Sequence, residues 1–176
     1  MKSILLSWIG DHDFKYQNSE ESRLGPIASI LRHHSETKRP FDEIFLLCDT
    51  RRYDQSRIIQ PYFERLVAAF QGCFHLECLN DIDDPSDFTL IYRHVDHLIT
   101  KVKTLYPRQE IKWHFNTTSG TNAMSSIWIL LGKTRYPGVL YHTWALQSDG
   151  GQSHVGECRI PFRLSLDSLS LESDPA

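Results

Sequence analysis

Residues 111–131 read IKWHFNTTSGTNAMSSIWILL, and this stretch contains the pattern that decides the fold. Its first five residues alternate between apolar and polar, with Ile111, Trp113 and Phe115 on one face, which is typical of a β-strand. Its second half places apolar residues at helical spacing. Between the two halves lie six small polar or glycine residues, 116–121. A strand that passes into a helix through a short polar turn is the basic unit of an α/β protein.

Strand-like and helix-like segments alternate along the rest of the chain. The segments expected to be strands are Ile4–Ile9, Ile44–Cys48, Phe74–Leu79, Ile111–Phe115, Val139–Leu146 and Cys158–Leu164. The segments expected to be helices are 25–31, one that begins or kinks near Gln60, Phe88–Leu105, and 123–131, which Gly132 is expected to end. This alternation predicts an α/β fold with a mainly parallel sheet covered by helices on both faces. No helix separates the last two strands, so we expect them to form a C-terminal β-hairpin.

The length and charge of the chain limit its functional classes. Its 176 residues correspond to one domain, which we place at 1–165, followed by a tail or linker at 166–176. The formal net charge of −3 argues against a non-specific nucleic-acid coat, although a local basic pocket for an anion is compatible with it. No segment resembles a signal peptide or a membrane span, so we expect a soluble, cytoplasmic protein.

The cysteines and histidines give no strong metal signal. The cysteines are Cys48, Cys73, Cys78 and Cys158. None forms a CxxC pair, which favours small buried thiols in a reducing compartment over zinc ligands or disulfides. His94 and His97 lie one helical turn apart but have no Cys or Glu partner at ligand spacing. We therefore predict no metal site.

Polar clusters follow several of the predicted strands, where an open α/β sheet binds its ligands. After the fourth strand, Gly120 allows a tight turn, and the next helix N-terminus offers free N–H groups to an anion. One residue, Ser119 or Thr121, would suffice as a helix cap, so the six polar residues indicate a phosphate or ribose site. The turn is neither a Walker A loop nor a GxGxxG motif, so we expect no nucleotide cofactor.

Two further clusters have an ordinary alternative. Arg51 and Arg52 follow the second strand and could contact phosphates, or could pair with Asp49 or Asp54 in a solvated loop. The run 11–13 (Asp-His-Asp) follows the first strand and could supply an acid, a base or a metal ligand. Capping of the next element is the favoured interpretation of this run, because metal sites gather their ligands from separate elements.

These features together resemble a known family. An apolar first strand ending SWIG at residues 7–10, and the motif WHFNTTSGTNAM at residues 113–124 after a later strand, are similar to CARF (CRISPR-associated Rossmann fold) domains. The resemblance covers roughly residues 1–165 and is strongest to the N-terminal sensor of the regulator of RNA terminal phosphate cyclase. It implies a six-stranded Rossmann-like domain that forms a homodimer and binds cyclic oligoadenylate, a tetra- or hexa-adenylate ring of type III CRISPR defence.

The resemblance also implies a set of site residues and several functions. The ligand-binding residues would be Gly10, Asp11, His12, Thr50, Arg51, Asn116, Thr117, Thr118, Ser119, Gly120, Thr121 and Met124. The main hypothesis is a sensor that controls a fused or partner effector, which would follow the tail. The alternatives are a metal-independent ring nuclease and a sensor of RNA ends or tRNA fragments that regulates RNA repair. In a nuclease the candidate catalytic residues are His12, Thr118, Ser119 and Arg51.

Overall fold

The computed structural model describes residues 1–15, 24–145 and 152–160. Six strands form one sheet in the order β3-β2-β1-β4-β5-β6. The strands are β1 (Lys2–Trp8), β2 (Glu43–Asp49), β3 (Cys73–Leu79), β4 (Ile111–Asn116), β5 (Gly138–Ala145) and β6 (Ser153–Glu157). Neighbouring strands are parallel except β6, which pairs antiparallel with β5. The predicted six-stranded, mainly parallel sheet and its C-terminal hairpin are confirmed.

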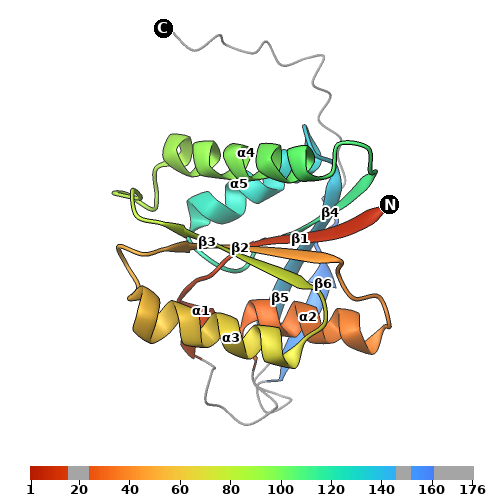
Figure 1. Cartoon of the computed structure of the whole chain (residues 1–176), viewed down its shortest axis with the longest axis horizontal. Helices are drawn as coiled ribbons and strands as arrows, with labels where there is room; N and C mark the ends of the chain where they lie inside the picture. The colour runs from red at the N-terminus through yellow and green to blue at the C-terminus, as the bar shows by residue number, and fades with distance from the viewer. Residues whose placement is uncertain (16–23, 146–151, 161–176) are drawn as a thin grey trace, which may run out of the picture.

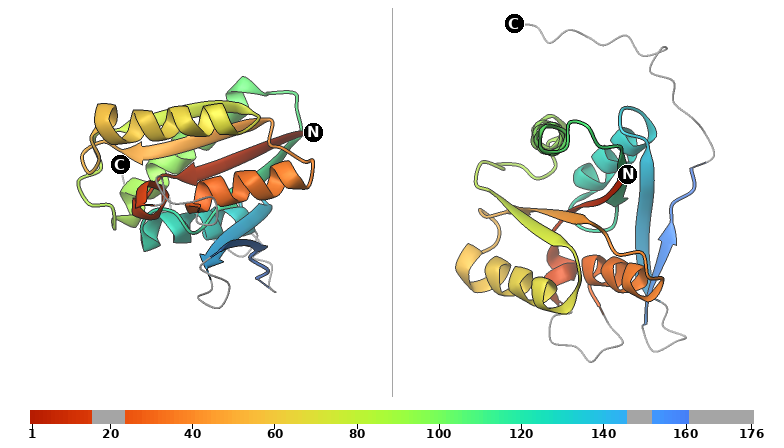
Figure 2. Two further views of the ribbon diagram at one scale, coloured as in Figure 1. Left: turned by 90° about the horizontal axis from the view of Figure 1, so that it is seen from below. Right: turned by 45° about the vertical axis from the view of Figure 1, so that its right-hand side comes forward.

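Helices cover both faces of this sheet. They are α1 (Asp11–Lys15), α2 (Pro26–Glu36), α3 (Gln60–Ala69), α4 (Phe88–Leu105) and α5 (Asn122–Lys133), with a π-helical turn η1 (Gln55–Ile59) before α3. Figure 1 shows α4 and α5 on one face and α1, α2 and α3 on the other, and Figure 2 shows the same layers from two further directions. None of the helices in the described ranges is long and apolar enough to cross a bilayer.

The central strands are apolar on both faces because both faces are covered. In β1, Leu6 and Trp8 pack in the core under α4 and α5, whereas Leu5 packs in the core under α2 and α3. Successive side chains of a strand point to opposite faces, so a strand between two helical layers needs a continuous apolar run. This requirement explains the apolar run that begins at Ile4.

The strand order reverses beside β1. The chain runs from β1 to β2 and β3 on one side, then crosses through α4 to β4 on the other side of β1. β1 and β4 are parallel neighbours, with Leu6 opposite Phe115. The helices that follow these two strands, α1 and α5, lie on opposite faces of the sheet (Figure 1), so the carboxyl ends of β1 and β4 form a switch point, where open α/β sheets bind ligands.

Two boundary predictions were wrong. Helix α5 continues through Gly132 to Lys133. A Cβ at Gly132 would lie 2.7 Å from Cδ2 of Leu140 and 3.1 Å from Cδ2 of Phe115, so glycine here permits close packing of the helix on the sheet. The sixth strand is Ser153–Glu157 rather than Cys158–Leu164, and residues 161–164 lie outside the described chain.

The cysteine prediction held only in part. All four cysteines are free, but only Cys48 is buried, and Cys73 at the start of β3 is exposed. The tail assigned to 166–176 lies outside the described residues.

Candidate functional site

The turns after β1 and β4 are in direct backbone contact. A Cβ added to Gly10 would lie 2.6 Å from the backbone nitrogen of Gly120, a distance that real side chains do not adopt. Gly120 itself has φ of 90°, in the region that favours glycine. The close approach of the two turns therefore requires glycine at both positions.

A buried carboxylate holds the turn after β1 in place. Asp13, in α1, accepts hydrogen bonds of 3.0 Å from the backbone N–H groups of Gly10 and Ile27. Ile27 lies in the first turn of α2, so Asp13 supplies an acceptor to a helix N-terminus. Burial raises the pKa of Asp13 to about 6, against the opposing effect of these hydrogen bonds. The prediction that the run 11–13 caps the next element is therefore correct for Asp13.

The turn after β4 uses most of its polar side chains internally. Asn116 is fully buried, and its Nδ2 donates to Oγ of Ser7 at 3.0 Å and to Oγ of Ser119 at 2.8 Å. Thr117 donates its hydroxyl to the carbonyl of Tyr141. The hydroxyl oxygen of Thr118 likewise accepts from a backbone N–H of β5, that of Thr143. These side chains fix the turn against β1 and β5, so they shape the site rather than offer free groups to a ligand.

The start of α5 is capped by Thr121. Its Oγ1 accepts from the backbone N–H of Met124 at 3.4 Å and donates to the carbonyl of Pro85 at 2.6 Å. The second bond ties the helix start to the loop that precedes α4. The remaining N–H groups of the first turn of α5 have no acceptor within the helix, and the helix dipole makes this end favourable for an anion.

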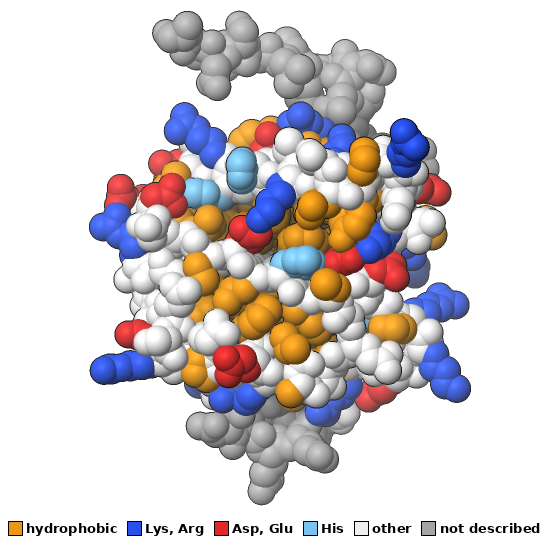
Figure 3. Space-filling view, viewed as in Figure 1, with side chains coloured by type: hydrophobic (Ala, Val, Ile, Leu, Met, Phe, Trp, Pro, Cys, Tyr) orange, Lys and Arg blue, Asp and Glu red, His pale blue; other side chains and the backbone are white. Residues whose placement is uncertain are grey.

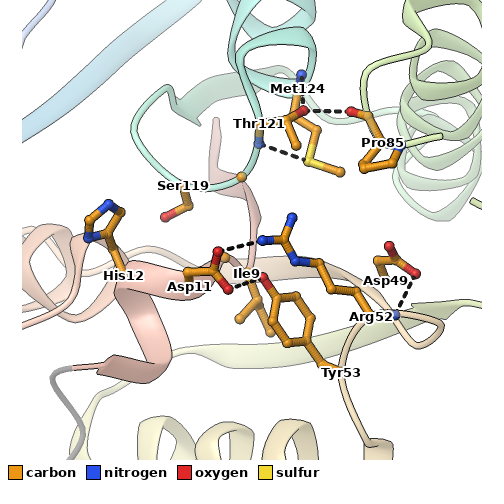
Figure 4. A pocket seen from close by; sticks show the side chains of 12 residues that line it. Ile9, Asp11, His12, Asp49, Arg52, Tyr53, Pro85, Ser119, Thr121 and Met124 are labelled. Atoms are coloured by element: carbon orange, nitrogen blue, oxygen red, sulfur yellow. Dashed lines mark hydrogen bonds and ion pairs between the residues drawn. The ribbon is translucent and has the colours of Figure 1, made fainter.

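The turn after β2 contributes a cation to the same edge. Buried Asp49 accepts from the backbone N–H groups of Arg51 and Arg52. Nη2 of Arg52 then lies 2.6 Å from Oδ2 of Asp11, whose other carboxylate oxygen accepts from the hydroxyl of Tyr53 at 2.7 Å. Figure 4 shows Arg52 and Tyr53 converging on Asp11 in this way.

Together these turns enclose a cavity of about 160 Å³ at the switch point. It is lined by Ile9, Gly10, Asp11, His12, Asp49, Arg52, Tyr53, Pro85, Ser119, Gly120, Thr121 and Met124. Ser119, Thr121 and Met124 come from one side of the cavity, and Asp11, His12 and Arg52 from the other (Figure 4). The cavity thus combines a helix N-terminus, hydroxyl groups, an imidazole and a guanidinium that is engaged by a carboxylate.

The structure brings only part of the predicted set to this cavity. The predicted residues that line it are Gly10, Asp11, His12, Ser119, Gly120, Thr121 and Met124. Those that do not line it are Thr50, Arg51, Asn116, Thr117 and Thr118. Arg51 forms an ion pair with Asp83 instead, and the hydroxyl of Thr50 donates to the carbonyl of Leu79.

Sequence reasoning did not place five lining residues in the site. These are Ile9, Asp49, Arg52, Tyr53 and Pro85. The sequence offers Arg51 and Arg52 as equivalent candidates. In the structure Arg52 pairs with Asp11 and faces the cavity, whereas Arg51 pairs with Asp83 and does not line it. Pro85 has no side-chain group that would mark it as a site residue in the sequence. Its carbonyl accepts a hydrogen bond from the hydroxyl of Thr121, which holds Pro85 beside the cavity.

The fold has a counterpart among solved structures. The chain matches Enterococcus italicus Csm6 bound to cyclic hexa-2′-fluoro-hexa-dAMP, with a TM-score of 0.63 and 20% sequence identity. The two chains share a Rossmann-like α/β fold. The match covers 81% of this chain but 33% of the Csm6 chain, so this chain spans about a third of the length of that protein. No protein-family model matches the sequence, and no curated protein matches it.

Proposed function

We propose that this chain is a sensor domain that binds a cyclic oligoadenylate of type III CRISPR defence and controls a fused or partner effector. One observation carries the proposal: a cavity with a free helix N-terminus and an arginine lies at the switch point of a fold shared with a Csm6 bound to a cyclic hexa-adenylate analogue. Phosphates of the ring would accept hydrogen bonds from the first turn of α5 and from Arg52.

The size of the cavity supports a homodimer. Its volume of about 160 Å³ is below the roughly 300–1,000 Å³ typical of sites that enclose a drug-sized ligand. One chain can therefore enclose only part of an oligonucleotide ring. We propose that two copies share one ring about a two-fold axis, each contributing the turns after β1, β2 and β4.

The ring nuclease is the weaker alternative. Of its four candidate catalytic residues, His12 and Ser119 line the cavity, whereas Thr118 bonds to β5 and Arg51 pairs with Asp83. The hydroxyl oxygen of Ser119 already accepts a hydrogen bond from Asn116, so it is engaged within the protein. Binding without cleavage needs only the free N–H groups at the start of α5 and the guanidinium of Arg52.

The proposal is tested by mixing the purified protein with cyclic tetra-adenylate and cyclic hexa-adenylate, with and without EDTA. Binding is measured by calorimetry, the ligand is then analysed by chromatography, and molar mass by light scattering. We expect one intact ring bound per two chains. Linear products in the presence of EDTA would favour the ring nuclease. Failure to bind either ring would refute both, and would direct attention to RNA ends or tRNA fragments.

Adjacent arginines provide a matched test of the site. Arg52→Gln should weaken binding about 10- to 100-fold, because a hydrogen bond to a charged group contributes about 1.5–3 kcal/mol. Arg51→Gln removes the same charge from the neighbouring position but outside the cavity, and should change affinity less than about threefold. Equal losses in both variants would mean that only net charge matters and that the cavity is not the site.

A further inference from the structure

A second cluster of chemically reactive side chains lies at the opposite edge of the sheet. Glu43 and Cys73 begin β2 and β3 and are direct register partners in these parallel strands. His75 follows Cys73 by two residues, so its side chain lies on the same face of the sheet. Adjacent strands lie about 4.8 Å apart, which brings the three side chains within reach of one another.

Their ligand atoms are close and well oriented. One carboxylate oxygen of Glu43, Sγ of Cys73 and one imidazole nitrogen of His75 all lie within 4.8 Å of one another. Nε2 of His75 is 2.7 Å from Oε2 of Glu43. The imidazole stacks on Phe45, with ring centres 4.2 Å apart and planes 9° apart, which holds its orientation. Among the residues that the structure describes, no other group of three or more such side chains meets these distances.

We propose that Glu43, Cys73 and His75 form a zinc-binding site. A thiolate, an imidazole and a carboxylate are the three ligand types that Zn²⁺ accepts, and three protein ligands leave a fourth position for water. Zinc lies about 2.0–2.3 Å from such ligands, so neighbouring ligand atoms in a tetrahedral site are about 3.3–3.7 Å apart. The carboxylate and imidazole must therefore separate by less than about 1 Å, while the sulfur of Cys73 already lies within 4.8 Å of both.

The remaining carboxylate oxygen is already held. Nζ of Lys2 pairs with Oε1 of Glu43, which leaves Oε2 as the oxygen that faces His75. Groups that hold a metal ligand from behind fix its orientation and commonly change metal affinity 10- to 100-fold. Lys2 would thus keep the carboxylate aimed at the metal while the metal occupies the side of Cys73 and His75.

Metal binding at this site releases a proton. Zinc binds the sulfur of Cys73 as a thiolate, so a protonated thiol gives up its proton to solvent when the Zn–S bond forms. Nε2 of His75 binds the metal through its lone pair, with the ring proton on Nδ1. The thiol proton is therefore the one released when the metal binds.

The cluster is accessible from solvent without unfolding. Cys73 is exposed, and the side chain of His75 is 32% exposed. β3 is an edge strand. The face that carries it shows hydrophobic side chains interrupted by histidine and by charged residues (Figure 3). The proposed zinc site lies at the amino ends of the strands and so does not depend on the proposed nucleotide site at their carboxyl ends.

Cobalt substitution tests the proposal with a spectroscopic signature. Protein stripped with EDTA is titrated with Co²⁺ and then with Zn²⁺. We expect a near-ultraviolet thiolate-to-cobalt band and strong visible bands of tetrahedral cobalt, both removed by Zn²⁺, with release of about one proton per metal. The absence of a saturable thiolate band in the wild-type protein would overturn the proposal.

Variants assign the ligands. Cys73→Ser should abolish the thiolate band, and His75→Gln should lower Zn²⁺ affinity by more than about 100-fold, beyond the usual effect of an outer partner. Cys78→Ser, on the same strand but outside the cluster, is the matched control and should leave the spectrum unchanged. Because Cys73 is exposed, its variant should keep the wild-type melting temperature. A band that persists in Cys73→Ser, or disappears in Cys78→Ser, would refute the assignment.

Discussion

The two edges of the sheet each contain a buried carboxylate, and the two carboxylates differ in what surrounds them. Asp13, at the carboxyl ends of the strands, is 1% exposed and accepts from two backbone N–H groups. Glu43, at the amino ends, is 5% exposed and faces Lys2 and His75. Burial raises the pKa of Asp13 to about 6, whereas the hydrogen bonds from Lys2 and His75 outweigh burial and lower that of Glu43 to about 2.

This difference distinguishes the edge that carries the proposed nucleotide site from the edge that carries the proposed zinc site. At the carboxyl edge, neutral N–H groups organise the turns, and the cavity's arginine pairs with the exposed carboxylate of Asp11. At the amino edge, the ammonium group of Lys2 pairs directly with the buried carboxylate of Glu43. A site for an exchangeable anion requires hydrogen-bond donors that are held in position but are not already paired with a buried carboxylate. Of these two clusters, only the one at the carboxyl edge meets that requirement.

The largest expected effect comes from deleting each carboxylate in turn. Asp13→Ala leaves the N–H groups of Gly10 and Ile27 without their acceptor in a buried site. Each orphaned group costs about 1–3 kcal/mol, so the free energy of unfolding should fall by roughly 2–5 kcal/mol.

The matched variant at the other edge is Glu43→Ala. It should lower the free energy of unfolding by only about 1–2 kcal/mol, because the side chains of Lys2 and His75 are 21% and 32% exposed and can rehydrate. Urea denaturation of both variants provides the measurement. Equal losses, or a larger loss for Glu43→Ala, would remove the distinction between the two edges.

A smaller effect, of opposite sign at the two edges, is expected from pH. Asp13 titrates near 3.9 in the unfolded chain and near 6 in the folded one, so the folded protein holds an extra proton between these values. Its contribution to the free energy of unfolding should therefore decline by up to roughly 3 kcal/mol as the pH rises from about 4 to about 6. Glu43 titrates near 4.3 unfolded and near 2 folded, so its contribution should be lost as the pH falls from about 4 to about 2.

These contributions are isolated by subtraction. Denaturation of the wild type, Asp13→Asn and Glu43→Gln is measured across pH 2–7, and the difference between wild type and each variant is plotted against pH. Two difference curves that slope in the same direction would contradict the opposite pKa shifts.

Much of the fold could be predicted because the central strands and long helices carry strong local patterns. The helix Phe88–Leu105 was the most secure prediction, since its apolar positions repeat at helical spacing over 18 residues. The signal was weakest at the sheet margin. β6 has the sequence SHVGE and is only partly buried, so the strand was predicted at the more apolar run that begins at Cys158. Helix α1 was missed because five residues give no periodicity, and its stability depends on the long-range bond from Asp13 to Ile27.

The site was harder to predict than the fold for a physical reason. The sequence identifies which turns carry polar residues and which strands precede them. From this information the turns that contain Gly10 and Gly120 were expected at the same edge of the sheet, where they are in contact. The sequence does not specify where each polar side chain points. Asn116 and Thr117 proved to hold the turn in place, and Arg52 rather than Arg51 faced the cavity, because those outcomes depend on partners distant in the chain.

The smallest expected effect tests whether the arginine of the carboxyl edge is truly available. Asp11 and Arg52 are 62% and 47% exposed, and an exposed ion pair is worth about 0.2–1 kcal/mol. A phosphate that binds Arg52 must compete with this pair. Asp11→Asn removes the competing charge but keeps an oxygen that can accept from Tyr53, so affinity for the cyclic oligoadenylate should rise about 1.4- to 5-fold.

The control for this variant is Asp83→Asn, which frees Arg51 outside the cavity and should leave affinity unchanged. Calorimetric titrations at low and high salt measure both variants. The gain from Asp11→Asn should shrink as salt screens the exposed charges. If Asp11→Asn instead weakens binding, Asp11 must contact the ligand itself, as an acceptor for ribose hydroxyls would. The carboxyl edge would then hold its ligand through charge of both signs, and would resemble the amino edge more closely than the pKa values suggest.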